Sequence, residues 1–238
     1  MKIMNYEVFV NNLGVVNLNK KQIINTINPH SYITAKKDLK FCEALQQSDI
    51  LIPDGSGIVL AAKVIYNKNI TKITGQDLHD FLLKKMKEKN GKVFYMGSSR
   101  ETLMKIEKRM SKEFPNISVS SFSPPFKSQF NEEENDIIIE KINSFDPDIL
   151  FIGMTAPKQE KWLYQNKDRL NYTVACSVGA VFDFYAGTIK RPSKLWINLH
   201  LEWLIRFLKE PRRLWKRNLI SLPLFLFDIL VYKLKIKV

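Results

Sequence analysis

The segment TAPKQEKW, residues 155 to 162, gathers hydrogen-bonding side chains directly after an apolar run of strand type. Ligands of parallel α/β sheets bind outside the carboxyl ends of the strands. Lys158, Gln159 and Glu160 are therefore candidates for ligand contacts, although Glu160 could instead pair with a cation within the fold. By spacing alone the segment predicts no more than a polar helix start, with Trp162 facing the core.

Asp54 is a second candidate, because it follows the strand-like run Ile50–Ile52 and is held by Pro53. A carboxylate placed rigidly in such a crevice can act as a general base; the alternative is an N-cap for the next helix. Gly55 and Gly57 supply half of a dinucleotide-binding fingerprint whose third glycine is replaced. They fit either close approach of a ligand or a plain turn.

Two further loops follow predicted strands. Gly97 and Ser98 lie where a strand meets a helix, and backbone N–H groups at a helix N-terminus suit a phosphate, although such turns also serve as ordinary connections. Residues 179–187 combine small residues with Asp183 just after the last predicted strand. This loop fits either a ligand contact or tight packing of the loop on the sheet.

No pattern in the sequence predicts a metal site or a cofactor. The triplet Asp146-Pro147-Asp148 resembles the DxD of nucleotide-sugar enzymes, but it precedes its strand and so lies at the wrong end of the sheet; we interpret it as a turn. Cys42 and Cys176 are far apart and indicate buried thiols in a reducing compartment. Neither metal-ligand spacing nor a nucleophilic triad is found for the three histidines, His30, His79 and His200.

The composition predicts one sizeable, strongly basic protein. The chain has 238 residues, of which 45% are hydrophobic, and its formal net charge is +13. The apolar content is enough for a full core, and the charge favours polyanionic partners: nucleic acid, an anionic membrane face or phosphorylated substrates. The first residues lack the apolar stretch of a signal peptide, so we expect a cytoplasmic protein.

Strand and helix patterns alternate along the chain up to residue 178. Such alternation is typical of βαβ units and predicts an α/β fold with a Rossmann-like, largely parallel sheet flanked by helices. The predicted strands are residues 6–17 (a strand or hairpin), 31–34, 50–52, 92–96, 117–122, 149–154 and 173–178. The predicted helices are residues 20–27, 38–47, 58–66, 76–89, 100–113, 132–144 and 157–169.

The composition changes towards the C-terminus, which predicts a catalytic domain of residues 1–193 and a helical appendage of residues 194–238. Basic residues alternate with tryptophans in the appendage, and its apolar stretch, residues 219–232, is interrupted by Pro223 and Asp228. This stretch is shorter than the roughly 20 residues that span a bilayer. It fits a helix in the interface of an anionic leaflet; the alternative is an ordinary helical pair packed on the core.

Several motifs in succession resemble the WecG/TagA/CpsF glycosyltransferases of bacterial surface-polymer synthesis, over nearly the whole chain. The motifs are residues 53–55 (PDG), 73–78 (ITGQDL), 153–162 (GMTAPKQEKW), 178–183 (VGAVFD), 186–191 (AGTIKR), 201–206 (LEWLIR) and 210–213 (EPRR). The resemblance implies an inverting, metal-independent enzyme that transfers N-acetylmannosamine, its uronic acid or glucose. The donor would be a UDP-sugar and the acceptor an undecaprenyl-diphosphate-linked sugar. The enzyme would serve polysaccharide or teichoic acid synthesis, peripherally on the inner face of the cell membrane.

The resemblance also implies roles for particular residues. The catalytic aspartate of the family falls on Asp54, its strand-end threonine on Thr34 and its conserved-type glutamine on Gln159. Arginines of the appendage, expected to complete the site over the diphosphate, correspond best to Arg206 and Arg213. The other substrate-binding candidates are Gly55, Gly57, Gly97, Ser98, Lys158, Glu160, Asp183, Arg191, Arg212 and Arg217.

Two positions depart from the family's pattern. Relatives often have an asparagine two residues after the threonine, where this chain has Lys36, and an arginine where it has Lys72. Lysine keeps the charge but lacks the bidentate fork of arginine, so the donor could differ from that of the best-known members. The oligomeric state is open, with a homo-oligomer among the alternatives.

Two other classes of protein stay open. A nicotinamide-dependent dehydrogenase would bind a pyrophosphate through residues 54–57. A non-catalytic module for nucleic acid or anionic lipid would explain the charge but not the polar strand ends. We favour the transferase, which involves no nucleic acid.

Overall fold

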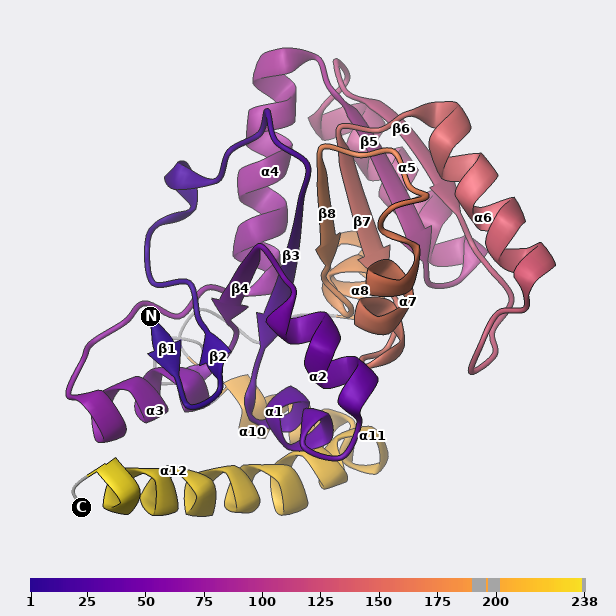
Figure 1. The fold of residues 1–238 in the computed structure, drawn as a ribbon. Coiled ribbons are helices and arrows are strands. Elements are labelled where there is room, and N and C mark those ends of the chain that lie inside the picture. The colour runs from indigo at the N-terminus through magenta and orange to yellow at the C-terminus, as the bar shows by residue number, and fades with distance from the viewer. Residues whose placement is uncertain (190–195, 197–201, 237–238) are drawn as a thin grey trace.

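The computed structural model describes residues 1–189, 196 and 202–236. In this part of the chain, six parallel strands form one sheet in the order β4-β3-β8-β7-β5-β6. Figure 1 shows helices on both of its faces. The strands are β3 (Gln22–Ile27), β4 (Ile50–Pro53), β5 (Lys92–Gly97), β6 (Ser118–Phe122), β7 (Ile149–Gly153) and β8 (Val174–Ser177). The predicted α/β class and parallel sheet are confirmed.

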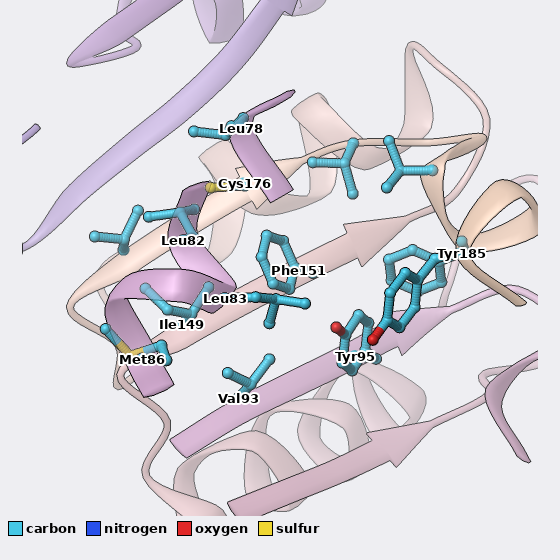
Figure 2. Packing of buried hydrophobic residues seen from close by; sticks show 14 of the residues in the cluster. Leu78, Leu82, Leu83, Met86, Val93, Tyr95, Ile149, Phe151, Cys176 and Tyr185 are labelled. Atoms are coloured by element: carbon cyan, nitrogen blue, oxygen red, sulfur yellow. The ribbon is translucent and has the colours of Figure 1, made fainter. Parts of the chain in front are cut away.

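One face of the sheet is covered by α4 (Gly75–Lys89), α5 (Arg100–Glu113) and α8 (Val181–Ala186). Figure 2 shows the apolar side chains of α4 lying over those of the central strands. His79 is buried among them, and its Nε2 lies 2.9 Å from the Tyr95 hydroxyl. Burial lowers the pKa of His79, so this histidine belongs to the core.

The opposite face is covered mainly by α6 (Glu132–Phe145) and α7 (Lys158–Asn166). Leu163 of α7 is fully buried in the same cluster as Ile152 of β7 and Ala175 of β8. The start of α7 therefore lies against the ends of two central strands, and this placement carries the TAPKQEKW segment to the edge of the sheet.

A third cluster joins the N-terminal hairpin, β1 (Lys2–Ile3) and β2 (Tyr6–Glu7), to several helices near the sheet edge. These helices are α1 (Pro29–Ala35), α2 (Leu39–Gln46), α3 (Ser56–Tyr66) and α12 (Leu222–Ile236). The remaining elements are the 3-10 helix η1 (Leu13–Val15), α10 (Glu202–Lys209), α11 (Pro211–Trp215) and the π-helix η2 (Lys216–Ser221).

The helix α12 packs on the rest of the protein along one side only. Phe225 and Ile229 are buried in the third cluster, whereas Phe227, Leu230 and Leu234 are exposed. Within the described residues, every helix is too short or too polar to cross a bilayer. The division of the chain at residue 193 stays a prediction.

The parallel strands bring all of their carboxyl ends to one edge of the sheet. Figure 1 shows the arrowheads of these strands directed towards the end of the molecule where α1, α10, α11 and α12 lie. Segments from both ends of the sequence thus meet at the edge where α/β sheets bind ligands.

Two predicted elements are wrong. Residues 20–27, predicted as a helix, form β3 from Gln22 onward; its apolar side chains occupy both faces because it is a central strand of a parallel sheet. Residues 31–34, predicted as a strand, lie inside α1, which begins with Pro29 and a capping box between Asn28 and Ser31. In residues 6–17 only Tyr6–Glu7 forms a strand. The segments predicted after residue 37 in the described region coincide with observed elements to within a few residues.

Candidate active site

A cleft of about 1640 Å³ opens at the carboxyl edge of the sheet. Its walls include the ends of β3, β5, β7 and β8, the loop between β6 and α6, and the segment from Leu214 to Arg217. One small ligand usually occupies a pocket of about 300–1,000 Å³. The cleft is larger than a pocket for one small ligand.

Most of the predicted site residues that the structure describes line this cleft. They are Asp54, Gly97, Ser98, Lys158, Gln159, Glu160, Asp183 and Arg217. Four others are not among its lining residues: Thr34, Gly55, Gly57 and Arg212. Arg191 lies outside the described residues, and the side chains of Arg206 and Arg213 are not described, so their roles stay predictions.

The peptide group that joins Pro53 to Asp54 is held by two main-chain hydrogen bonds. Its N–H donates to the carbonyl of Ile27 in β3 at 2.9 Å, and the Pro53 carbonyl accepts from the N–H of Ile73 at 3.1 Å. Gly55, not Asp54, is the N-cap of α3, and no side chain caps that helix. The capping interpretation of Asp54 is therefore wrong, and its carboxylate is delivered to the cleft by fixed backbone.

The two glycines of the half-fingerprint have structural roles. Gly55 adopts a φ of 100° at the start of α3, a region of conformation that favours glycine. A Cβ on Gly57 would lie 2.3 Å from Cγ of Pro29, so this glycine allows α3 to approach α1. Gly57 thus serves the packing of α3 on α1 and Gly55 serves the backbone turn, while the expected contact of both glycines with substrate stays a prediction.

Thr34 is not a strand-end residue. It lies in the last turn of α1, where its hydroxyl donates to the carbonyl of His30 at 2.8 Å. The strand-end threonine at the cleft is Thr26 of β3, and Asn28 follows it two residues later. The order of threonine and asparagine expected from the resemblance is thus present at residues 26–28, which sequence reasoning missed because β3 was taken for a helix.

Lys36 was interpreted as a departure from the family's pattern in the donor site, but its side chain contacts the appendage instead. It forms an ion pair with Asp228 of α12, with 2.6 Å between Nζ and Oδ2. This pair joins the end of α1 to the appendage. The expectation that Lys36 replaces a site asparagine is therefore wrong, and the role of Lys72 stays a prediction.

Gln159 and Glu160 are buried although they line the cleft. Gln159 Oε1 accepts from the N–H of Met154 at 3.2 Å, and its Nε2 donates to Glu160 Oε1 at 2.8 Å. Burial raises the pKa of Glu160 to about 7, and the hydrogen bond from Gln159 opposes this effect. The sequence had left open a pair between Glu160 and a cation; in the described part of the chain Glu160 contacts an amide instead.

Lys158 organises the cleft wall. Its Nζ donates to the carbonyl of Lys127 at 2.6 Å and lies 3.7 Å from the centre of the Phe130 ring. Burial lowers the pKa of Lys158. At the other end of the same loop, the Ser123 hydroxyl donates to the carbonyl of Ser98 at 2.8 Å. Sequence analysis missed this loop as part of the site.

The turn before α5 was expected to suit a phosphate, but its Ser98 N–H and Ser99 hydroxyl already form hydrogen bonds within the protein. The N–H of Ser98 donates to the carbonyl of Gly153 at 3.0 Å, and Ser99 caps α5 by accepting from the N–H of Thr102. A φ of 115° at Gly97 places a would-be Cβ 2.6 Å from the Gly153 carbonyl oxygen. These residues join β5 to β7 at the floor of the cleft.

Cations of the appendage reach the cleft through Lys216 and Arg217. The Nδ1 atom of His30 lies 2.8 Å from the Ser221 hydroxyl and joins α1 to η2. Burial, and secondarily Arg217, lower the pKa of His30. Lys216 and His30 were not predicted, because neither has motif spacing.

The Asp146-Pro147-Asp148 triplet is a turn, as predicted. Asp146 adopts a left-handed conformation after α6, and Asp148 accepts a hydrogen bond from the N–H of Lys92 at 2.7 Å. Among the residues that the structure describes, no three His, Cys, Asp or Glu side chains are grouped so that they could hold a metal ion.

Known proteins resemble this chain over nearly its whole length. The profile of the glycosyl transferase WecG/TagA/CpsF family matches residues 1–238. An N-acetylglucosaminyldiphosphoundecaprenol N-acetyl-beta-D-mannosaminyltransferase of Bacillus spizizenii is 30% identical over 227 residues, covering 94% of this chain and 86% of the relative. A protein of the same name from Staphylococcus aureus strain MW2 is 30% identical over 237 residues, covering 99% of this chain and 88% of the relative.

The parallel sheet with a large cleft at its carboxyl edge defines an α/β protein with a Rossmann-like fold. The chain belongs to the WecG/TagA/CpsF family and is a glycosyltransferase.

Proposed function

We propose that the protein transfers a sugar of the N-acetylmannosamine type, its uronic acid or glucose from a UDP-sugar to an undecaprenyl-diphosphate-linked sugar, with inversion and without a metal ion. The names of the relatives support the acceptor. The observation that carries the proposal is a cleft of about 1640 Å³ that is lined by Asp54 and also by the cations Lys216 and Arg217.

In this mechanism Asp54 accepts the proton of the acceptor hydroxyl while that oxygen attacks the anomeric carbon of the donor. The bond from that carbon to the UDP oxygen breaks with its electrons, and the developing charge on the diphosphate is stabilised by fixed cations and dipoles. Lys216, Arg217 and the N-terminus of α5 supply such groups at the cleft. Thr26, Asn28 and Gln159 orient sugar hydroxyls.

The acceptor is a lipid, so we propose that the exposed side of α12 lies on the inner face of the bacterial cell membrane. Phe227, Leu230 and Leu234 on this side are exposed, and Lys233 and Lys235 accompany them. Apolar side chains flanked by lysines suit the interface of an anionic leaflet. Synthesis of a surface polysaccharide or teichoic acid is the process that this reaction would serve.

A screen of UDP-sugars with an undecaprenyl-diphosphate-GlcNAc analogue, in the presence of EDTA, tests the function by product mass and anomeric configuration. We expect one donor to give a disaccharide product of inverted configuration. Transfer only after addition of a divalent cation would contradict metal independence, and retention of configuration would contradict direct displacement. NAD(P)H binding in place of sugar transfer would favour the dehydrogenase alternative.

A further inference from the structure

Glu160 is a buried carboxyl at the inner wall of the cleft. It is 2% exposed and lies one helical turn before Leu163, which is fully buried between α7 and the sheet. Residues three apart share a face of a helix. Glu160 therefore points towards the sheet while it still borders the cleft.

The carboxyl is the end of a hydrogen-bonded chain. The N–H of Met154 donates to Gln159 Oε1, and Gln159 Nε2 donates to Glu160 Oε1. These two contacts fix which end of the Gln159 amide faces the strand exit and which faces the helix. A primary amide has a second N–H and a second lone pair, so Gln159 keeps bonding capacity for a ligand.

The second carboxyl oxygen, Oε2, is buried without a hydrogen-bond partner, and Ser177 Oγ and Asn25 Oδ1 share this property in the described region. Ile24 of β3 pairs with Cys176 of β8, and the next step of this register places Asn25 beside Ser177. Ser177 shares a face of β8 with Ala175, which packs with Leu163 of α7. A buried acceptor left unpaired is destabilising, so a protonated carboxyl, which supplies a donor, suits this layer.

We propose that Glu160 is a positioning residue: its carboxyl, through Oε1, holds the Gln159 amide in the orientation that presents the free N–H of that amide to the sugar nucleotide. This inference rests on the proposed function of the cleft. Glu160 itself is buried under the wall, so it acts through Gln159 and not on the reacting atoms.

The surroundings of Glu160 favour the neutral form. The two lysines beside it on α7 are engaged elsewhere, Lys158 by the Lys127 carbonyl and Lys161 by Asp38 of α2 at 2.8 Å. From α6, Asn135 accepts from the Trp162 indole, and Glu134 is paired with Lys127. The strands beneath contribute the uncharged Asn25 and Ser177. The other charged residues that line the cleft are Asp54, Asp183, Lys216, Arg217, Lys40, Lys127 and Arg100, and His30 is a further titratable residue of the lining.

Since the pKa of Glu160 is about 7, the neutral form is lost as the pH rises through 7. Ionisation strengthens the hydrogen bond from Gln159 to Oε1 but leaves a charged Oε2 buried without a partner, so we expect kcat of the wild type to change across this range. Glu160→Gln keeps an acceptor for Gln159 but does not titrate, so this variant should retain most of the activity and lose that pH dependence. A merely structural role would leave the pH profile unchanged.

A double-mutant cycle tests the action through Gln159. Glu160→Met should lower kcat/KM about ten- to hundred-fold, the usual effect of one broken buried hydrogen bond. In the Gln159→Met background the same change should cost less than about twofold. Glu88→Gln, on the exposed side of α4, is the control. Equal effects of Glu160→Met in both backgrounds would overturn the proposal, and so would a Glu160→Met variant with wild-type kcat/KM.

Side-chain amide NMR signals separate this proposal from the function of the cleft. The Gln159 NH₂ signals, assigned by their loss in Gln159→Met, should shift with a midpoint near pH 7 in the wild type and stay constant in Glu160→Gln. If no UDP-sugar is transferred although these signals titrate, only the function fails. Signals that do not titrate would overturn the positioning role. The same spectra show whether each variant is folded.

Discussion

Lys158 of α7 donates a hydrogen bond of 2.6 Å to the main-chain carbonyl of Lys127 across the mouth of the cleft. This hydrogen bond thus supports the loop between β6 and α6, which lines the cleft from Ser123 to Phe130. Phe126 at the tip of this loop is fully exposed. An aromatic ring held above a substrate cleft offers a flat apolar surface to a ligand, and Lys158 determines where the loop that carries it lies.

Removal of the Lys158 ammonium should loosen the loop between β6 and α6. Lys158→Met keeps the aliphatic stem but loses the ammonium, so trypsin should cut after Lys127 about fivefold faster or more, given the usual strength of a hydrogen bond from a charged group. Limited proteolysis followed by mass spectrometry measures this rate, and KM for the donor should rise. Lys105→Met, which breaks an exposed pair with Glu101, is the control. Equal cleavage of both variants would contradict the support of this loop by Lys158.

Loss of the Asp54 carboxylate should remove the general base. Asp54→Asn is expected to lower kcat by about 10²–10⁴-fold, the usual contribution of a positioned base, with little effect on donor KM. Asp136→Asn, on the exposed side of α6, should keep wild-type kcat. Single-turnover transfer measured by product mass distinguishes chemistry from product release. Near-normal transfer by Asp54→Asn would exclude Asp54 as the base.

Two phenylalanines of α12 separate folding from membrane contact. Phe225 is buried, and the centre of its ring lies 5.2 Å from the centre of the Tyr32 ring, whereas the Phe227 side chain is 63% exposed. Phe225→Ala should lower the free energy of unfolding by about 3–5 kcal/mol. Phe227→Ala should change it by less than about 0.5 kcal/mol yet weaken binding to anionic vesicles about tenfold or more, since a buried Phe contributes about 1.5–3 kcal/mol.

Urea unfolding and vesicle sedimentation measure these two effects on the full chain. Unchanged sedimentation of Phe227→Ala, and of a variant with Leu230 and Leu234 also replaced by serine, would place the membrane contact elsewhere on the protein.

Acid should weaken the junction between α1 and the appendage. The pKa of His30 is lowered by burial and then by Arg217, so the unfolded chain takes up a proton more readily than the folded one. The stability contributed by neutral His30 is full above the unfolded pKa of about 6.5 and is lost as the pH falls below it.

His30→Asn should accordingly show a smaller loss of unfolding free energy between pH 7.5 and 5 than the wild type. Urea unfolding at several pH values measures both slopes. Identical slopes would mean that the acid sensitivity arises at other groups, such as the buried His79.

The sequence predicted the sheet and the position of Asp54 because both depend on local patterns. Apolar runs followed by turn residues identify strands, and a residue that follows a strand in a parallel sheet must lie at its ligand edge. The error at β3 arose because Ile23, Ile24 and Ile27 have helical spacing, while a strand buried on both faces needs no alternation.

Thr34 was misplaced through the same error, since Thr26 lay inside the supposed helix. The Asn28-Pro29 pair was the available signal: an N-cap followed by proline at the first helical position predicts the start of α1. The contacts of Lys158 with Lys127 and of Lys36 with Asp228 join segments far apart in sequence. Spacing carries no information on such contacts, and only the folded arrangement reveals them.

The packing of α12 determines how the proposed membrane contact would orient the cleft. Phe225 and Ile229 share a core with Ile27 and Leu51 of the sheet, so α12 cannot swing away without opening that core. The helix α12 is therefore a fixed part of the fold and not a flexible tether. If a bilayer takes up its exposed leucines as proposed, the cleft must meet the headgroup layer at one height and one tilt, and both are fixed when the chain folds.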